Sequence, residues 1–180
     1  TLNVRTMPPG FTGTISTATA NKVQLIVGAL RAWTGAVSGD WTVSGNWIGG
    51  VPAGGENIAF GNFTNQPTSN IPAISLGSIA LTNTTGSYNI SSANTFTLTR
   101  GAVPPAIYNN TAQSNTLAVP ITFSTAAPTI RTDASGMLTL NGAISNGGLL
   151  LTVDSAGNCI ISGAISGAAG LTKTGTGMMM

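Results

Sequence analysis

Four acidic side chains are the groups in this sequence that could carry acid–base chemistry. The 180 residues contain four Asp and Glu in total and no His. The lack of His excludes His-based catalytic triads and the commonest zinc ligand. Two of the acids, Asp133 and Asp154, are 21 residues apart in two similar segments, TDASGMLTLNGAIS and VDSAGNCIISGAIS. Whether these two carboxylates come together depends on the fold.

A pair of carboxylates about 5–10 Å apart is what a glycosidase needs, and equivalent positions on successive coils could approach that distance. DASG and DSAG favour a simpler interpretation, because Asp at the first position and Gly at the fourth are typical of a turn capped by Asp. A weak calcium site is a third interpretation, but the further carboxylates that such sites gather are missing. We therefore predict turns here, with no catalytic residue, no metal and no cofactor, and a chain that is not an enzyme.

Aromatic residues form a second group that could bind a ligand. Indole rings stack on sugars, so a cluster of tryptophans could form a glycan-binding face. Nearby acids, Asp40 and Glu56, could line that face or pair with Arg31. The alternative, which we favour, is an apolar plug that caps or orders the first coil, with its N–H groups hydrogen-bonded. The tryptophans are Trp33, Trp41 and Trp47.

Composition limits the classes of partner. Charged residues make up only 6% of the chain, and the net charge is +2. Six scattered Lys and Arg form no basic stripe, so we expect no nucleic-acid partner despite a pI of about 9.1. No apolar run approaches the roughly 18 residues of a membrane span, so we expect none in this segment. Cys159, the single cysteine, is predicted to be a small buried hydrophobe.

The pattern along the chain is that of an all-β protein. Ser, Thr, Asn and 24 Gly replace the missing charge, and the residues usual on helix surfaces are scarce. The best helix candidate, Val23–Trp33, alternates as a strand would. Elsewhere short alternating segments are separated by Gly, Asn, Ser or Pro. The predicted strand segments are 78–83, 87–91, 95–100, 117–123, 137–145 and 159–166.

The repeated segment decides between two all-β architectures. A sandwich or barrel needs no likeness between its strands, whereas a solenoid repeats equivalent positions at a period of about 20–45 residues. We predict a right-handed parallel β-helix or β-solenoid, with a β-sandwich carrying a solenoid-like C-terminal part as the alternative. The superimposed pairs are Asp133 and Asp154, Gly136 and Gly157, Leu140 and Ile161, and Leu150 and Leu171.

Stacking of parallel coils also accounts for the composition. Equivalent residues lie about 4.8 Å apart, so a charge on every coil would repel its own copy, while Thr, Ser and Asn ladders would not. At about 22 residues a coil, the chain would make roughly eight coils and a rod of about 40 Å. LAVPITF aligns with LNGAISN only at an offset of 23, and residues 62–130 have the weakest repeat signal.

Two stretches resemble the autotransporter-associated β-strand repeat proteins, which are bacterial exported proteins with β-helical passengers. WTGAVSGDWTVSGNWIGGVPAGGENIAFG, residues 33–61, is similar to the tryptophan-rich part of that family, and GAISGAAGLTKTGTG is similar to its glycine-rich repeat. The resemblance implies a solenoid domain over residues 33–177 and a location outside the cell or on the bacterial cell surface. Residues 1–32 are predicted to be closing strands of a preceding unit or a donated strand, and residues 178–180 a tag or truncation scar.

These observations give two expectations for function. The first is a structural β-solenoid segment of a stalk, coat or fibre that associates head to tail into a filament, with residues 1–30 as a donated strand. Its basis is that the coil ends of a solenoid recruit further strands unless they are capped. The second is an adhesin or carbohydrate-binding module whose partner is a surface polysaccharide.

Overall fold

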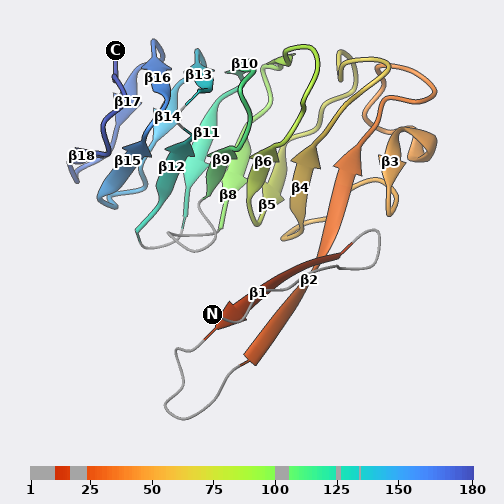
Figure 1. Cartoon of the computed structure of the whole chain (residues 1–180), viewed down its shortest axis with the longest axis horizontal. Helices are drawn as coiled ribbons and strands as arrows, with labels where there is room; N and C mark the ends of the chain where they lie inside the picture. Colours follow the sequence, from red (N-terminus) through yellow and green to blue (C-terminus); the bar gives the residue numbers. More distant parts are fainter. Residues whose placement is uncertain (1–10, 17–23, 100–105, 125–126, 134) are drawn as a thin grey trace.

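The computed structural model describes residues 11–16, 24–99, 106–124, 127–133 and 135–180, and within them nearly all regular structure is β. One short 3-10 helix, η1 (Ser44–Asn46), is present in this part of the chain. Figure 1 shows the strands as successive rungs of one body, with a two-stranded hairpin projecting from it. The strands are β1 (Phe11–Ser16), β2 (Gln24–Trp33), β3 (Trp47–Ile48), β4 (Asn57–Phe60), β5 (Ile74–Leu76), β6 (Ile79–Leu81), β7 (Asn89–Ser91), β8 (Phe96–Leu98), β9 (Ile107–Asn109), β10 (Ser114–Ala118), β11 (Ile121–Phe123), β12 (Thr129–Thr132), β13 (Met137–Leu140), β14 (Ile144–Ser145), β15 (Leu151–Ser155), β16 (Asn158–Ile161), β17 (Ile165–Ser166) and β18 (Leu171–Thr174).

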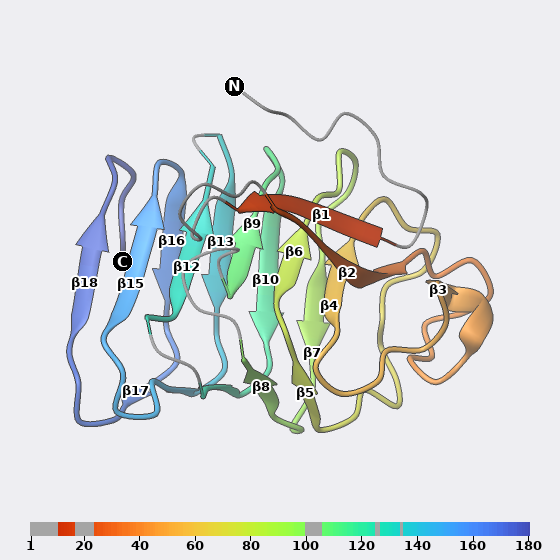
Figure 2. The same ribbon diagram turned by 90° about the horizontal axis from the view of Figure 1, so that it is seen from below.

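The body of the molecule is a β-solenoid of about six turns, as the repeated segment predicted. A nine-stranded sheet has the order β1-β2-β4-β6-β9-β12-β15-β18, with β3 paired to β2. A four-stranded sheet has the order β16-β13-β10-β7, and a five-stranded sheet the order β17-β14-β11-β8-β5. The chain visits the nine-, four- and five-stranded sheets in turn, so neighbours in each sheet come from successive coils (Figure 2).

Strand direction excludes the sandwich alternative for the described chain. From β4 to β18 the pairs between coils are parallel, and the antiparallel pairs are β1 with β2 and β2 with β3. Residues 62–130, whose repeat signal is weak, contain regular rungs from β5 to β11. Their signal is weak because the register between coils changes, from 21 residues for Ile58 and Ile79 to 28 for Ile79 and Ile107.

The core is a set of apolar columns that run along the solenoid axis. In the five-stranded sheet Phe96, Ile121 and Ile144 are register partners on successive coils, and each is at most 1% exposed. Each side chain therefore packs on the one above it and the one below it. Burial of a Leu, Ile or Phe side chain contributes about 1.5–3 kcal/mol, so the columns account for much of the stability.

The repeated segment GAIS marks a corner, where the chain leaves one sheet and enters the next. Gly142 lies between β13 and β14, and Gly163 lies between β16 and β17. A Cβ atom on Gly142 would be 1.9 Å from the carbonyl oxygen of Val119, and one on Gly163 would be 1.9 Å from that of Gly142. Successive corners thus stack backbone on backbone, and a side chain has no room. The predicted single strands at 137–145 and 159–166 are each two strands joined at such a corner.

The register confirms most of the predicted pairs and corrects two of them. Leu140 and Ile161 are partners, and Gly157 packs against the carbonyl of Gly136. The prediction that Asp133 and Asp154 superimpose is wrong, because the partner of Asp154 is Arg131. Residues 133–136 separate β12 from β13, whereas only residues 156–157 separate β15 from β16, so the offset changes within one coil. Leu171 pairs with Leu151 and not with Leu150.

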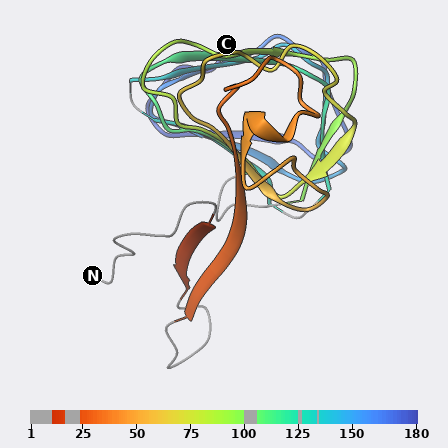
Figure 3. The ribbon, with the colours of Figure 1, turned by 90° about the vertical axis from the view of Figure 1, so that its right-hand side faces the viewer.

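The predicted count of about eight coils is too high, because the first part of the chain is not coiled. Residues 34–56 lie across one end of the solenoid, beside β4 in Figure 1 and inside the outline of the coil in the end view of Figure 3. Residues 11–16 and 24–29 form the projecting hairpin. Residues 1–10 and 17–23 of the predicted N-terminal segment lie outside the described residues.

Candidate functional site: the tryptophan cap and the projecting arm

The three tryptophans form one buried cluster at the β4 end of the solenoid. Trp33 at the end of β2 and Trp47 at the start of β3 are antiparallel register partners, and Trp41 lies in the loop between them. Their exposed fractions are 1%, 5% and 0% respectively. The ring centroids are 5.0 Å apart for Trp33 and Trp47 and 4.6 Å apart for Trp41 and Trp47, in edge-to-face arrangements. Such pairs are among the favoured geometries for aromatic rings.

This cluster closes the first coil. Trp41 contacts Phe60 of β4 and Phe96 of β8, with centroid distances of 6.2 and 5.8 Å, so it continues the core columns. The indole N–H of Trp33 donates to the carbonyl of Asn65 and that of Trp47 to the carbonyl of Trp41, both at 2.8 Å. The Nε1 atom of Trp41 has no partner within the described chain. The observed arrangement is thus the predicted apolar plug, with two of its three N–H groups hydrogen-bonded.

Burial also decides what these rings can contact. A sugar stacks on an exposed ring face, and none of the three indoles presents one in this structure. Trp33, Trp41 and Trp47 are therefore not a glycan-stacking surface in the observed arrangement. Carbohydrate binding by another face of the molecule stays a prediction.

A buried asparagine that the sequence did not single out holds the cap loop together. The side-chain oxygen of Asn46 accepts the N–H groups of Val37 and Ser38 at 2.8 and 2.9 Å. Its amide nitrogen donates to the Ser38 hydroxyl at 3.0 Å and to the carbonyl of Asp40 at 2.7 Å. The side chain is fully buried and all four of its hydrogen-bonding positions are used. The only sequence signal for it is its place inside SGNW, which is also an ordinary turn composition.

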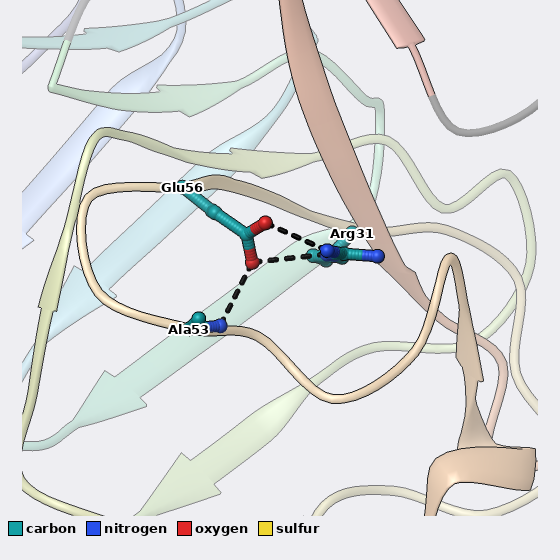
Figure 4. Close-up of polar contacts among 3 residues, drawn as sticks. All are labelled: Arg31, Ala53 and Glu56. Atoms are coloured by element: carbon teal, nitrogen blue, oxygen red, sulfur yellow. Dashed lines mark hydrogen bonds and ion pairs between the residues drawn. The ribbon is translucent and has the colours of Figure 1, made fainter.

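An ion pair fixes the strand that leaves the solenoid (Figure 4). Arg31 of β2 donates from Nε and Nη2 to the two carboxylate oxygens of Glu56, at 2.9 and 2.7 Å. The Ala53 N–H also donates to Glu56, at 2.8 Å. These bonds lower the pKa of Glu56 and raise that of Arg31. A bidentate pair of this kind is stronger and more directional than a single contact, so it sets the orientation of β2 as it leaves the coil.

Asp40, the other acid near the tryptophans, does not reach Arg31. Its carboxylate accepts the N–H and hydroxyl of Thr42, each at 2.8 Å, and the side-chain amide of Asn70 at 2.8 Å. These hydrogen bonds lower its pKa, with the Thr42 backbone contact as the largest cause. Asp40 therefore fastens the cap loop to the next coil, and only Glu56 fulfils the expected pairing with Arg31.

The arm, which we define as residues 11–16 and 24–29, is an antiparallel hairpin outside the solenoid (Figures 1 and 3). β2 is ten residues long, and only its residues 30–33 pair with β4. Among the described strands β1 pairs with β2 alone. One strand therefore runs without a break from the nine-stranded sheet into the arm, and the outer edge of β1 has no strand beside it in this part of the chain.

The two repeated aspartates lie in different surroundings. Asp133 accepts the hydroxyl of Tyr108 at 3.1 and 3.3 Å, and its carboxylate lies 3.8 Å from Nε of Arg131. The Arg131 guanidinium also lies over the Tyr108 ring, at 5.5 Å. Burial and the bond to Asp133 raise the pKa of Tyr108. The backbone turn predicted at Asp133 is present, since the Gly136 N–H donates to the Asp133 carbonyl at 3.0 Å.

Asp154 lies within β15 and not in a turn, so that part of the prediction is wrong. Its carboxylate accepts the hydroxyl of Thr174 on the next coil at 3.3 Å. The sequence did not indicate a role for Tyr108, because its position over Arg131 depends on the 23-residue register of β9, β12 and β15. The group is a surface network of one aromatic ring, one cation and two anions on the outer face of the nine-stranded sheet.

Within the described residues, no three His, Cys, Asp or Glu side chains lie together in a way that could hold a metal ion. The same part of the chain has no helix with the length and apolar character that crossing a membrane requires. Cys159 is fully buried, and burial raises the pKa of its thiol to about 11. Comparisons with protein-family models, with curated proteins and with solved structures found no match for this chain.

Proposed function

We propose that this chain is a structural module: a rigid β-solenoid rod that joins neighbouring copies through its arm to build a stalk, coat or fibre. One observation carries the proposal. β2 belongs to the nine-stranded sheet over residues 30–33 and to the projecting hairpin over residues 24–29, so the arm is a rigid extension of the rod. The Arg31–Glu56 pair lies at the junction of the two parts.

The arm has the properties of a segment that is completed by a partner. An isolated two-stranded hairpin is at best marginally stable in water, and a third strand or a packed face is needed for stability. FTGTIS and QLIVGA, the two strand sequences of the arm, contain no charged residue. Charge and proline are the usual protection of an edge strand, and their absence favours pairing with another strand. Addition of a strand to β1 is thus the interaction that the arm supports best.

The geometry of the rod favours an open assembly. The cap of Trp33, Trp41 and Trp47 covers one end, so a copy cannot add there by simple stacking of coils. An arm that reaches a different surface of the next copy makes a heterologous contact, and such contacts give filaments when they do not close into a ring. Head-to-tail association through the arm is the form of assembly that we propose.

The setting follows from the sequence resemblance. The solenoid is the fold that a β-helical passenger would have, and the tryptophan-rich and LTKTGTG segments both lie within it or cap it. We propose on this basis that the module is exported and acts at the bacterial cell surface, as a member of an autotransporter-associated repeat protein. A surface polysaccharide is then a plausible neighbour, but no exposed residue group in the described chain favours it over a second copy.

Sedimentation velocity and negative-stain electron microscopy over a range of concentrations test the arm. Proline at Thr14 removes a backbone N–H from β1, which disrupts either the added strand or the hairpin, whereas Thr14→Val keeps the N–H and the strand propensity. We expect the wild type and Thr14→Val to form elongated oligomers and Thr14→Pro to stay monomeric with an unchanged circular dichroism spectrum of the solenoid. Oligomers of Thr14→Pro equal to those of the wild type, or a wild type that is monomeric throughout, would refute the proposal.

A further inference from the structure

One column of the core changes its chemistry at the last rung of the nine-stranded sheet. The register partners that make up this column are apolar and fully buried up to β15, and the next position, on β18, is a lysine. By parity along β18, Lys173 points to the same side as Leu171, which pairs with the buried Leu151. The column is Ile58, Ile79, Ile107, Ile130, Val153 and Lys173.

The ammonium group of Lys173 is held by backbone carbonyls and not by an acid. Nζ donates to the carbonyls of Thr174, Gly175 and Ser155 at 2.5, 3.1 and 3.4 Å. Within the described chain no carboxylate lies at ion-pair distance from it. The aliphatic stem can cover the apolar side chain of Val153 while the charged end stays in contact with water, as long basic side chains commonly do. The three donors of the ammonium thus close the strand end and keep a full charge there.

The surroundings of Lys173 are apolar and would otherwise favour stacking. Ile165 and Met179 are 42% and 37% exposed, whereas their register partners on the coil below, Ile144 and Cys159, are 1% and 0% exposed. Side chains that a further coil would bury are therefore open on this face. A second molecule that stacked its own strands here would gain apolar contact and would also have to remove the ammonium of Lys173 from water.

We propose that Lys173 is a gatekeeper that prevents another copy of the chain from stacking directly on the coil of β16, β17 and β18. Burial of an unpaired charge costs several kcal/mol, which offsets the gain from covering side chains such as Ile165 and Met179. Inward-pointing charges at a sheet edge are one of the ways in which natural β-proteins avoid edge-to-edge aggregation. The inference goes beyond the proposed function, because it concerns a contact that the molecule avoids at the face opposite the tryptophan cap.

Valine at position 173 restores the residue type of the column, and Thr172 gives a matched control. Thr172 is exposed on the opposite side of the same strand, so Thr172→Val adds the same apolar surface without touching the column. All variants carry Thr14→Pro, which removes association through the arm and separates this test from that of the proposed function. Lys173→Gln keeps the length of the side chain and removes the charge, in case valine prevents folding.

The measurement is the concentration at which half of the protein is associated, by sedimentation velocity, with electron microscopy to show the direction of growth. We expect this concentration to fall at least tenfold in Lys173→Val and Lys173→Gln, with particles that lengthen along the solenoid axis. Lys173→Arg and Thr172→Val should behave like the Thr14→Pro parent. An unchanged midpoint in the folded Lys173→Val or Lys173→Gln proteins, or an equal shift in Thr172→Val, would overturn the gatekeeper role.

Discussion

Ile144 and Ile165 are register partners on neighbouring parallel strands, although they are 21 residues apart in sequence. The N–H of Ile144 donates to the carbonyl of Ala164 at 2.8 Å, which is a ladder bond between one coil and the next. Two copies of GAIS thus lie directly above one another, and each repeats the same corner and the same short strand. The repeat in the sequence is the stacking of the coils.

The corner glycines should be among the least tolerant positions of the chain. Alanine at Gly163 would place its Cβ 1.9 Å from the carbonyl oxygen of Gly142, so the backbone of two coils must move apart. We expect Gly163→Ala to lower the free energy of unfolding by more than about 3 kcal/mol, in the range of severe steric strain. Gly54→Ala is the matched control, since its nearest atom is 4.0 Å away, and its effect should be within about 1 kcal/mol. Equal denaturation midpoints for the two variants would contradict the stacked corners.

The tryptophan cap should contribute to stability and not to sugar binding. Trp41 is fully buried between Trp47 and the first coils, so Trp41→Ala leaves a large cavity. We expect a loss of about 3–5 kcal/mol, measured by chemical denaturation, and a smaller loss for Trp41→Phe. A glycan array on the same proteins separates the two roles. Loss of a reproducible glycan signal in a Trp41→Phe protein of nearly wild-type stability would show that the ring does contact sugar.

Acid should weaken the junction between the arm and the solenoid. Because the pKa of Glu56 in the folded protein lies below its usual value of 4.5, its pairing with Arg31 stabilises the fold above that pH. The contribution is lost as the pH falls from about 4.5 through the folded pKa. We expect Glu56→Gln to be less stable than the wild type by about 1–2 kcal/mol at pH 7, and the difference to approach zero below about pH 3.

Asp40 gives the control for this pH dependence, since its pKa is also lowered but its partners are Thr42 and Asn70. Both Glu56→Gln and the wild type keep Asp40, so its titration cancels in their difference. A difference in unfolding free energy that stays constant from pH 7 to pH 3 would show that the Glu56 carboxylate does not pair in its charged form.

The buried thiol gives a probe of the last coils. Cys159 is 0% exposed, and desolvation raises the pKa of its thiol to about 11, so both access and thiolate content are low at pH 8. We expect its reaction with an aromatic disulfide reagent to be at least a hundredfold slower in the native protein than in denaturant. Fast native labelling would show that the coil of β16 to β18 opens readily, and would argue against a rigid rod.

Much of the fold was open to prediction from sequence, because a solenoid repeats its requirements. Each coil needs apolar side chains at the same inward positions and glycine at the same corner, so Ile144 and Ile165, or Gly136 and Gly157, align by eye. The strand register does not follow from the same alignment, because turn length changes independently of strand length. Two extra residues in the turn after β12 were enough to place Arg131, and not Asp133, beside Asp154.

The cap and the arm were less predictable, because they occur once. The tryptophans and Glu56 suggested a plug and an ion pair, but Asn46 is an ordinary turn residue until the loop folds around it. The inward direction of Lys173 could have been read from its parity with Leu171, once the register of β18 with β15 was known. A lysine in a predicted strand is otherwise assigned to the solvent side.

The most direct test of the parallel, in-register stack is a disulfide ladder on the outer face of the five-stranded sheet. Thr122, Ser145 and Ser166 are register partners on three successive coils, about 4.8 Å apart between neighbours, which suits a disulfide. In a Cys159→Ala background, the cysteine pairs 122 with 145 and 145 with 166 should oxidise to more than half completion without loss of stability. The pair 122 with 166, about 9.6 Å apart, should remain reduced. Oxidation of that outer pair, or failure of both neighbouring pairs in folded protein, would contradict the stacked coils on which the rod, its arm and its gatekeeper depend.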